Sequence, residues 1–461
     1  MDEFHSFYYG TTCNEPETSD IVLPSGTEMT PTLLKELIDH HQENHVPRFK
    51  ILKNAYENKY KIFSEEAKPK GKPDNRLSAN FAKYITDTMN GFFIGIPIKV
   101  THPNSDRHEI IKSFESRNVQ EDLDSELSKH SSIYGVCYEL LYQSDDGKAY
   151  STLLKPLSAF KVYDDSVLRR SMYGVHYWYN EQGEVNGTFS DKEGVYSFSE
   201  KDGTLNIYDV EPHYFGDVPM IEYKDNDEKQ GIYEGVLNLI NAYNKALSEK
   251  ANDVDYFADA YLKILGMVVD EEELNNMRTN RTINADDASA IVEFLQKPDG
   301  DATQENLIER LERLIFQLSM VADISDESFG TQSGIALKYK LQAMKNLAKT
   351  KERKFTASMK QRYRLLCNYP QIGLQEDDWE KLSFVFTLDY PANIAEEASI
   401  AANLSGTTSE KTRLSVLSIV DDPDAELQQR ESEQAQRANL SVKYETSRTG
   451  VTDDEAKPKE E

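Results

Sequence analysis

The chain has 461 residues, of which 52 are Lys or Arg and 80 are Asp or Glu, so its formal net charge at pH 7 is −28. A chain of this length can bury a large core and form about two to four domains. The charge argues against a free-standing sequence-specific nucleic-acid binder, which needs a basic face, although it permits a protein past which DNA slides. The three cysteines, Cys13, Cys137 and Cys367, lie far apart without metal-ligand spacing, which indicates a reducing compartment and no zinc site.

No stretch approaches about 18 consecutive apolar residues, the length that a membrane-spanning helix needs. The N-terminal sequence MDEFHSFYYG is acidic where a signal peptide is basic. We therefore expect a soluble protein that is intracellular when it is made and has no membrane partner. Residues 1–30 carry few periodic apolar positions and are expected to be flexible.

Residues 31–225 carry the patterns of one α+β domain. Thr30, followed by proline, predicts the start of a first helix. A later apolar helical face ends near Gly91, the expected C-terminal residue, and a strand-like run follows from Phe92 to Val100. Helix is predicted again over 108–130.

From residue 140 to 222 the apolar period is close to two, which indicates strands. Turn sequences interrupt this stretch at Asp145-Asp146-Gly147, Glu181-Gln182-Gly183 and Lys201-Asp202-Gly203. The pattern therefore predicts a series of hairpins.

Beyond a polar boundary at 223–231, apolar residues at spacings of three and four predict three long helices. They span 232–259, 304–322 and 335–370. Thr303 is the expected N-cap of the second helix. Residues 380–440 predict shorter helices, and residues 441–461 form a polar, acidic tail that is expected to be disordered.

The insertion at 260–303 separates the first two long helices and contains two predicted strands, Ile264–Val269 and Ala290–Leu295. Apolar residues at this spacing also suit a helical-bundle core or a coiled coil, whose helices a tight turn would join. Because a strand-bearing insertion joins these two instead, we expect them to form a stalk with a small domain at its end.

The sequence lacks the common enzyme motifs GxxxxGK[ST], HExxH and GxSxG. His41 and His45 are spaced to share one helical face and could hold a metal. Without a third ligand nearby we expect an ordinary surface pair. The many carboxylates could include a glycosidase pair, but sequence spacing does not single one out. We expect no enzyme, metal site or cofactor.

Charge is distributed unevenly along the second half of the chain. From Asp225 to Glu312 there are 20 acids and 8 bases, whereas from Ile335 to Tyr369 there are ten bases and one acid. Such a run is usually a solvated basic face. Here it could equally pair with a neighbouring copy or face phosphates.

Five segments together resemble one family, the portal proteins of long-tailed double-stranded DNA phages of Gram-positive bacteria. They occur in the family's order: NRLSANFAKYITDTMNGFFIGIPI (75–98), SSIYGVCYELLY (131–142), LINAYNKALSEKANDVDYFADAYLKILG (239–266), ESFGTQSGIALKYKLQAMKNLAKTKERKF (327–355) and LSIVDDPDAELQQRESEQ (417–434). The resemblance extends from about residue 31 to 440.

The resemblance implies a homo-oligomeric ring, usually of twelve subunits, at one vertex of the capsid in the virion. Double-stranded DNA is pumped through such a ring by a terminase and later leaves through it. The further partners it implies are a head–tail adaptor and the capsid and scaffolding proteins, and assembly would take place in the host cytoplasm.

The resemblance also divides the chain into parts. These are a wing (31–225), a stem (232–259 and 304–322), a clip (260–303), a tunnel loop (323–334), a long wing helix (335–370) and a crown (380–440).

The segment DISDESFGTQSGIALKYKL, residues 323–341, contains this tunnel loop, which the resemblance places in the central channel. Its expected DNA-channel residues are Asp323, Ser325, Asp326, Glu327, Ser328, Phe329, Gly330, Thr331, Gln332 and Ser333. The acids would discourage tight phosphate binding, and the hydroxyl and amide groups would contact DNA without reading its sequence. A glycine-containing loop can also be a plain connector.

Lys338, Lys340 and Lys345 follow the loop and are expected to contact either DNA phosphates or a neighbouring subunit. Two other functions stay open at this point. One is a head–tail connector or minor head protein, which is usually much shorter. The other is a carboxylate-dependent hydrolase, which would be a compact monomer with a cleft.

Overall fold

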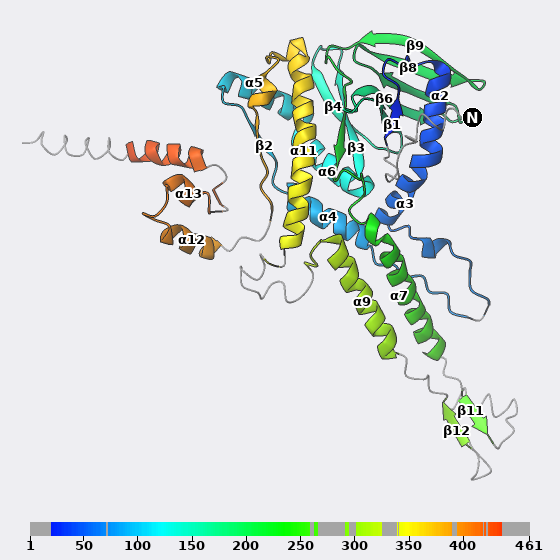
Figure 1. The fold of residues 1–461 in the computed structure, drawn as a ribbon. Coiled ribbons are helices and arrows are strands. Elements are labelled where there is room, and N and C mark those ends of the chain that lie inside the picture. Colours follow the sequence, from blue (N-terminus) through cyan, green and yellow to red (C-terminus); the bar gives the residue numbers. More distant parts are fainter. Residues whose placement is uncertain are drawn as a thin grey trace, which may run out of the picture. The chain divides into compact units, whose positions relative to one another are not determined.

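The structure is a computed structural model that describes residues 20–70, 72–258, 262–265, 291–294, 301–324, 339, 341–389, 394–417, 419–420 and 423–435. It divides into two compact units. The first contains the described parts of 20–324 together with 341–389, and the second contains the rest. Mixed helices and strands in the first unit confirm the α+β class (Figure 1).

The larger sheet of the first unit has six strands in the order β1-β5-β6-β7-β8-β9. They are β1 (Ile21–Leu23), β5 (Ala159–Asp164), β6 (Ser171–Tyr179), β7 (Val185–Ser190), β8 (Gly194–Lys201) and β9 (Thr204–Pro212). β1 pairs in parallel with β5, and the pairs from β5 to β9 are antiparallel. The predicted turns at Gly147, Gly183 and Gly203 are confirmed, and each glycine has a positive φ that other residues resist.

One face of this sheet carries a hydrophobic core. The helix α2 (Pro31–His40) buries Leu34, Leu37 and Ile38 against sheet residues that include Val175 and Phe198. Thr30 is the N-cap, as predicted, because its side chain accepts a hydrogen bond from the Leu33 amide at 3.2 Å.

A second sheet has three antiparallel strands in the order β10-β3-β4, and a third pairs β13 with β2. Their bounds are β3 (Val136–Gln143), β4 (Ala149–Leu154), β10 (Met220–Lys224), β2 (Lys99–Thr101) and β13 (Ser383–Val385). Five helices accompany these sheets: α3 (Val46–Tyr56), α4 (Phe81–Ile94), α5 (Ser105–Asn118), α6 (Gln120–Tyr134) and α11 (Gln342–Asn368). α11 packs on β10, and the Phe355 ring lies 4.8 Å from that of Tyr223.

α7 (Leu237–Ala258) and α9 (Asp301–Ser319) lie side by side in Figure 1. The end of α7 meets the start of α9, since Gln304 donates a hydrogen bond to Asp253 at 2.9 Å and Lys250 pairs with Glu305. The two helices are therefore antiparallel. Between them in the chain, β11 (Leu262–Leu265) pairs in antiparallel with β12 (Ile291–Phe294), so both predicted strands are present.

The second unit contains α12 (Ile394–Asn403), α13 (Glu410–Leu414) and a helical segment at 423–435. α13 has a side-chain N-cap, because Ser409 accepts a hydrogen bond from the Thr412 amide. This agrees with the short helices predicted for 380–440. Residues 1–19 and 436–461, which contain most of the expected flexible N-terminus and all of the expected disordered tail, lie outside the described residues.

Several predicted helix boundaries are wrong. α4 continues through Gly91 to Ile94, because burial of Phe92, Phe93 and Ile94 outweighs the cost of about 1 kcal/mol for a glycine inside a helix. The strand predicted at Phe92–Val100 shrinks accordingly to β2. The helix predicted over 108–130 is two helices that meet at Val119, which has a φ of 48°.

The long helices also begin at other residues than predicted. α9 begins at Asp301, so Thr303 lies within its first turn and is not the N-cap. α7 begins at Leu237, because residues 234–236 form a 3₁₀ turn in which Val236 is buried. Just before that turn Tyr233 is buried, and its hydroxyl donates to the Leu52 carbonyl at 2.7 Å.

The expectation that His41 and His45 form a surface pair is wrong. His41 lies in a π-helical turn, His41–His45, and only 2% of it is exposed. Its Nδ1 lies 2.7 Å from the Tyr177 hydroxyl, and its ring stacks on that of His45. Burial lowers the pKa of His41 to about 3 and that of His45 to about 4, so both rings are neutral near pH 7 and pack as uncharged groups.

Candidate functional site

The end of α9 is the first element of the candidate site, because the segment singled out from sequence begins there. After Met320, which has a φ of 60°, Val321 is buried. The Tyr84 hydroxyl on α4 lies 3.4 Å from Asp323 Oδ1, to which it donates, and accepts a hydrogen bond from the Ile324 amide at 2.9 Å. Asp323 is therefore held against α4, and the chain leaves this anchor after Ile324.

All of the remaining predicted loop residues lie outside the described part of the chain. These are Ser325, Asp326, Glu327, Ser328, Phe329, Gly330, Thr331, Gln332 and Ser333, and also Lys338 and Lys340. Lys345 is described: it is exposed on α11 and makes no ion pair with any residue that the structure describes. Next to it, Leu341 and Met344 are buried and fix the start of α11.

Aromatic rings join α4 to both α7 and α9. The Phe81 ring on α4 lies 4.9 Å from Tyr243 on α7 and 5.6 Å from Phe316 on α9. Tyr84 contacts the same Phe316 ring at 5.6 Å. α4 therefore positions both α7 and α9, and it also holds Asp323, which follows the end of α9.

A row of polar side chains on α7 holds the extended segment 75–79. Asn244, Ser248 and Asn252 are spaced by four residues and are each at most 5% exposed. Their oxygens accept hydrogen bonds from the amides of Ala79 (2.8 Å), Leu77 (2.9 Å) and Asn75 (2.6 Å), respectively. The Ser248 hydroxyl also donates to the Leu77 carbonyl at 3.1 Å. The helix thus supplies hydrogen-bond partners for three amides and one carbonyl of this segment.

A buried ion-pair network fixes α11 to the body of the protein. The Arg362 guanidinium is fully buried, and its Nε lies 2.9 Å from both carboxylate oxygens of Glu139 on β3. Its terminal nitrogens bond Asp124 on α6. The Tyr223 hydroxyl donates to Glu139 at 2.9 Å, and the Tyr363 hydroxyl donates to Glu115 at 2.6 Å.

The charges in this network follow from one cation meeting several carboxyl groups. Burial raises the pKa of Glu139, and the nearby Arg362 opposes this rise. Burial also raises the pKa of Glu115 against the hydrogen bond from Tyr363. Burial alone would lower the pKa of Arg362, but Asp124 and Glu139 raise it well above its ordinary range, so it stays charged.

Lys351, which precedes Arg362 on α11, makes a second buried contact with the body of the protein. Its Nζ lies 2.9 Å from Asp225 and donates to the Ser128 carbonyl at 2.8 Å. Only 3% of the residue is exposed. Arg362 and Lys351 thus fix α11 at two points along its length. Arg362 contacts β3 and α6, and Lys351 contacts α6 and Asp225.

The predicted basic run therefore divides into two classes in the described residues. Five members form ion pairs within the chain: Lys349, Lys351, Lys354, Arg362 and Arg364. Lys345, Arg353 and Lys360 are exposed and form none with a described residue. A uniformly solvated basic face is thus wrong, because half of the run is used internally.

Sequence reasoning missed the structural roles of Arg362, Lys351 and the Asn244–Ser248–Asn252 row. A signal existed for the row, since three polar residues at a spacing of four share one helical face. No comparable signal existed for Arg362, because its partners lie more than 200 residues away in sequence.

The described residues give no sign of metal or membrane chemistry. No three His, Cys, Asp or Glu side chains among them are grouped to hold a metal ion. None of the described helices is both long and apolar enough to cross a bilayer. The described residues form long helices, α7, α9 and α11, that are anchored by buried contacts, with the strand pair β11 and β12 between α7 and α9 in the chain.

Comparison with known proteins identifies the family. Residues 35–440 match the family described as "Phage portal protein, SPP1 Gp6-like". A portal protein of Clostridium phage phiCD119 is 23% identical over 239 residues, which cover 50% of this chain and 52% of that relative. The chain thus spans about half the length of the relative it matches.

Among solved structures, a chain titled "Neck of empty GTA particle computed with C6 symmetry" aligns with a TM-score of 0.48 and 12% identity. The alignment covers 79% of this chain and 92% of that chain. The family match itself spans most of the chain and agrees with the resemblance of its five segments. The chain belongs to the SPP1 Gp6-like family of phage portal proteins.

Proposed function

We propose that this chain is the subunit of a portal ring at one capsid vertex of a phage virion, through which DNA enters and leaves. The observation that carries the proposal is the family match over residues 35–440. Two features of the fold support it: the antiparallel pair α7 and α9, and the strand pair inserted between them. An element of this kind can line a passage, since its two helices are each anchored at the same end.

The proposal assigns the parts of the ring to elements of the chain. Residues 31–225 form the wing, α7 and α9 the stem, 260–303 the clip, α11 the long wing helix and 380–440 the crown. The clip, carried on the end of two helices, docks the terminase during packaging and the head–tail adaptor afterwards. The ring is a homo-oligomer that assembles in the host cytoplasm. Its further partners are the capsid and scaffolding proteins.

The tunnel loop begins, in this proposal, after the anchor made by Tyr84. Because Asp323 and Ile324 both contact Tyr84, we treat Asp323 as the base of the loop. The stretch that follows, with Asp326 and Glu327, faces the DNA. Its acids keep the contact weak, and its hydroxyl and amide groups provide contacts that do not depend on sequence.

Lys345 lies just beyond the loop and tests the channel assignment. If Lys338, Lys340 and Lys345 meet phosphates, binding weakens with salt at a slope of about 0.9 per neutralised phosphate. Replacing all three by Gln should then leave the ring intact and slow DNA packaging in a terminase-driven assay. The matched control replaces three exposed lysines elsewhere in the first unit by Gln, namely Lys50, Lys70 and Lys201.

Two results would contradict this assignment. Normal packaging by intact triple-variant rings at every salt concentration would make the three lysines part of the scaffold only. Rings that loosen in the triple variant would instead assign these lysines to contacts between neighbouring subunits.

A further inference from the structure

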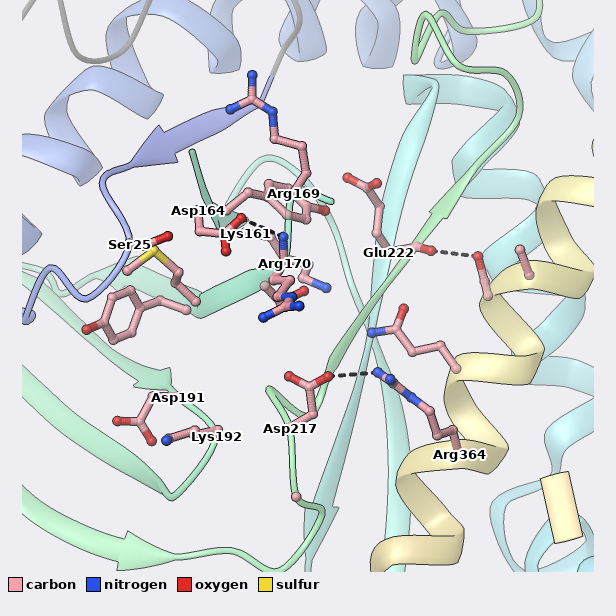
Figure 2. A pocket seen from close by; sticks show the side chains of 18 of the residues that line it. Ser25, Lys161, Asp164, Arg169, Arg170, Asp191, Lys192, Asp217, Glu222 and Arg364 are labelled. Atoms are coloured by element: carbon pink, nitrogen blue, oxygen red, sulfur yellow. Dashed lines mark hydrogen bonds and ion pairs between the residues drawn. The ribbon is translucent and has the colours of Figure 1, made fainter. Parts of the chain in front are cut away.

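A large cleft in the first unit lies apart from the elements assigned above to the DNA passage. It has a volume of about 1310 Å³ and lies between β5 and β6 of the six-stranded sheet, with the loops beside them, and β10 and α11. Figure 2 shows Lys161, Arg169 and Arg170 on the sheet side, and Arg364 across from them on α11. The cleft is open to solvent and is polar along much of its wall.

The cleft is richer in cations than the chain as a whole. Its basic residues are Lys161, Arg169, Arg170, Lys192, Lys224, Lys354, Lys360 and Arg364, and its acidic residues are Glu28, Asp164, Asp191, Glu193, Asp217 and Glu222. The lining therefore carries a positive excess, whereas the whole chain carries −28.

Several of the acids are already occupied. Asp164 accepts hydrogen bonds from the amide of Arg170 at 2.8 Å and from Ser166. Asp191 accepts from the amides of Glu193 and Gly194. Asp217 pairs with Arg364 at 2.7 Å, and Glu222 pairs with Lys229. Because these carboxylates already have hydrogen-bond or ion-pair partners, they compensate few of the other cations of the cleft.

Four cations of the cleft form no ion pair with any described residue: Lys161, Arg169, Arg170 and Lys360. Lys161 is the most informative, because only 4% of it is exposed. Burial lowers the pKa of Lys161 to about 8, although Glu222 and Asp217 oppose the change. A buried ammonium group that forms no ion pair with a described residue is stabilised by an anion that enters the cleft.

We propose that this cleft receives a carboxylate-bearing segment of a second copy of the chain and so forms part of the contact between neighbouring subunits. The inference rests on the ring proposed above and goes beyond it by naming the surface. Copies that each carry −28 repel one another. A closed assembly of them needs places where cations of one copy meet acids of the next.

The mixed charge of the lining favours a polypeptide over DNA. Duplex DNA presents one phosphate for about every 1.7 Å of its axis, so acids such as Glu28 and Glu193 would oppose a continuous backbone. A polypeptide can instead place separated carboxylates against separated cations. The chain's 80 acidic residues make a second copy the most abundant source of such segments.

The first test joins amines to carboxylates without a spacer. Rings assembled from an equal mixture of ¹⁴N- and ¹⁵N-labelled chains are treated with a carbodiimide. The reagent joins a lysine amine to a carboxyl group as an amide and itself takes up the elements of water to become a urea. Mass spectrometry should find Lys161 or Lys360 joined to an Asp or Glu of the other isotope. Links at these lysines confined to one isotope, or no links there, would overturn the proposal.

The second test reverses two exposed charges whose side chains form no ion pair with a described residue. Arg170→Glu with Lys360→Glu should raise the concentration at which rings dissociate by roughly tenfold or more. The matched control is Lys50→Glu with Lys201→Glu, which makes the same change in net charge at exposed lysines outside the cleft. Mass photometry across a dilution series reads the assembly state.

The outcomes separate this inference from the proposed function. If wild-type rings form and the cleft variant dissociates like the control, the cleft inference is wrong and the portal proposal stands. If wild type stays monomeric, the ring itself is wrong. Loss of DNA retention by a variant whose assembly is unchanged would assign the cleft to nucleic acid and overturn the inference.

Discussion

Arg362 shows how one residue can fix a long helix in place. It brings a permanent positive charge to a site with no solvent access, where Glu139 and Asp124 accept all of its strong contacts. Such a group adds little when compared with a well-packed apolar residue, but its loss leaves buried carboxylates without a cation. Without Arg362, we expect α11 to lose its fixed position against β3 and α6.

Replacing Arg362 by Met should therefore lower the free energy of unfolding by about 3–5 kcal/mol. Urea denaturation followed by circular dichroism measures the loss. Arg364→Met is the matched control, because the pair of Arg364 with Asp217 is 43% and 32% exposed and should contribute less than about 1 kcal/mol. Equal losses in the two variants would contradict the role given to the buried network.

Glu115 gives this network a dependence on pH. Because burial raises its pKa above the ordinary value of 4.5, the folded protein binds a proton there more readily than the unfolded chain. The resulting stability is fully present below pH 4.5 and is lost as the pH rises through the raised pKa.

Glu115→Gln should thus be more stable than wild type at pH 7, and the difference should shrink as the pH falls to about 4. The Gln oxygen can still accept from Tyr363. Thermal unfolding across this pH range gives the comparison, with the exposed Glu121→Gln as control. A variant that is less stable than wild type at pH 7 would show that the ionised carboxylate is needed.

At the scale of elements, the sequence pattern correctly predicted the features that depend on residues close together in the chain. The Thr30 cap, the glycine turns and the strands β11 and β12 follow from short-range chemistry, and all were expected from the sequence. α4 was predicted too short because its burial is a tertiary effect that outweighs the glycine. The partners of Arg362 could not be predicted, since no periodicity links residues so distant in the chain.

The row on α7 makes a prediction at this scale. Asn252→Ala removes the acceptor of the Asn75 amide and should cost about 1–3 kcal/mol. Hydrogen exchange should also speed up in peptides that cover 75–79, because the segment loses one of the hydrogen bonds that attach it to the helix, although the Asn75 side chain still donates to Asp255. Asn238→Ala is the control, since Asn238 is exposed on the same helix. Unchanged exchange at 75–79 would mean that other contacts hold the segment.

At the scale of the whole molecule, a strongly acidic chain belongs to the SPP1 Gp6-like portal family, and we propose that it forms a ring. The anchored helices α7, α9 and α11 supply stiffness, and the segment between α9 and α11 supplies the contact with DNA in our proposal. The net charge alone argues against a free-standing sequence-specific nucleic-acid binder. The net charge could not indicate which cations form ion pairs within the fold and which, like Lys345 and Lys360, are exposed.

The assembly state of the purified chain tests the central claim most directly. Native mass spectrometry together with electron microscopy should show a closed ring of identical 52.7 kDa chains around a central hole. A chain that remains a monomer of that mass at micromolar concentration, at low and at high salt, would contradict the account.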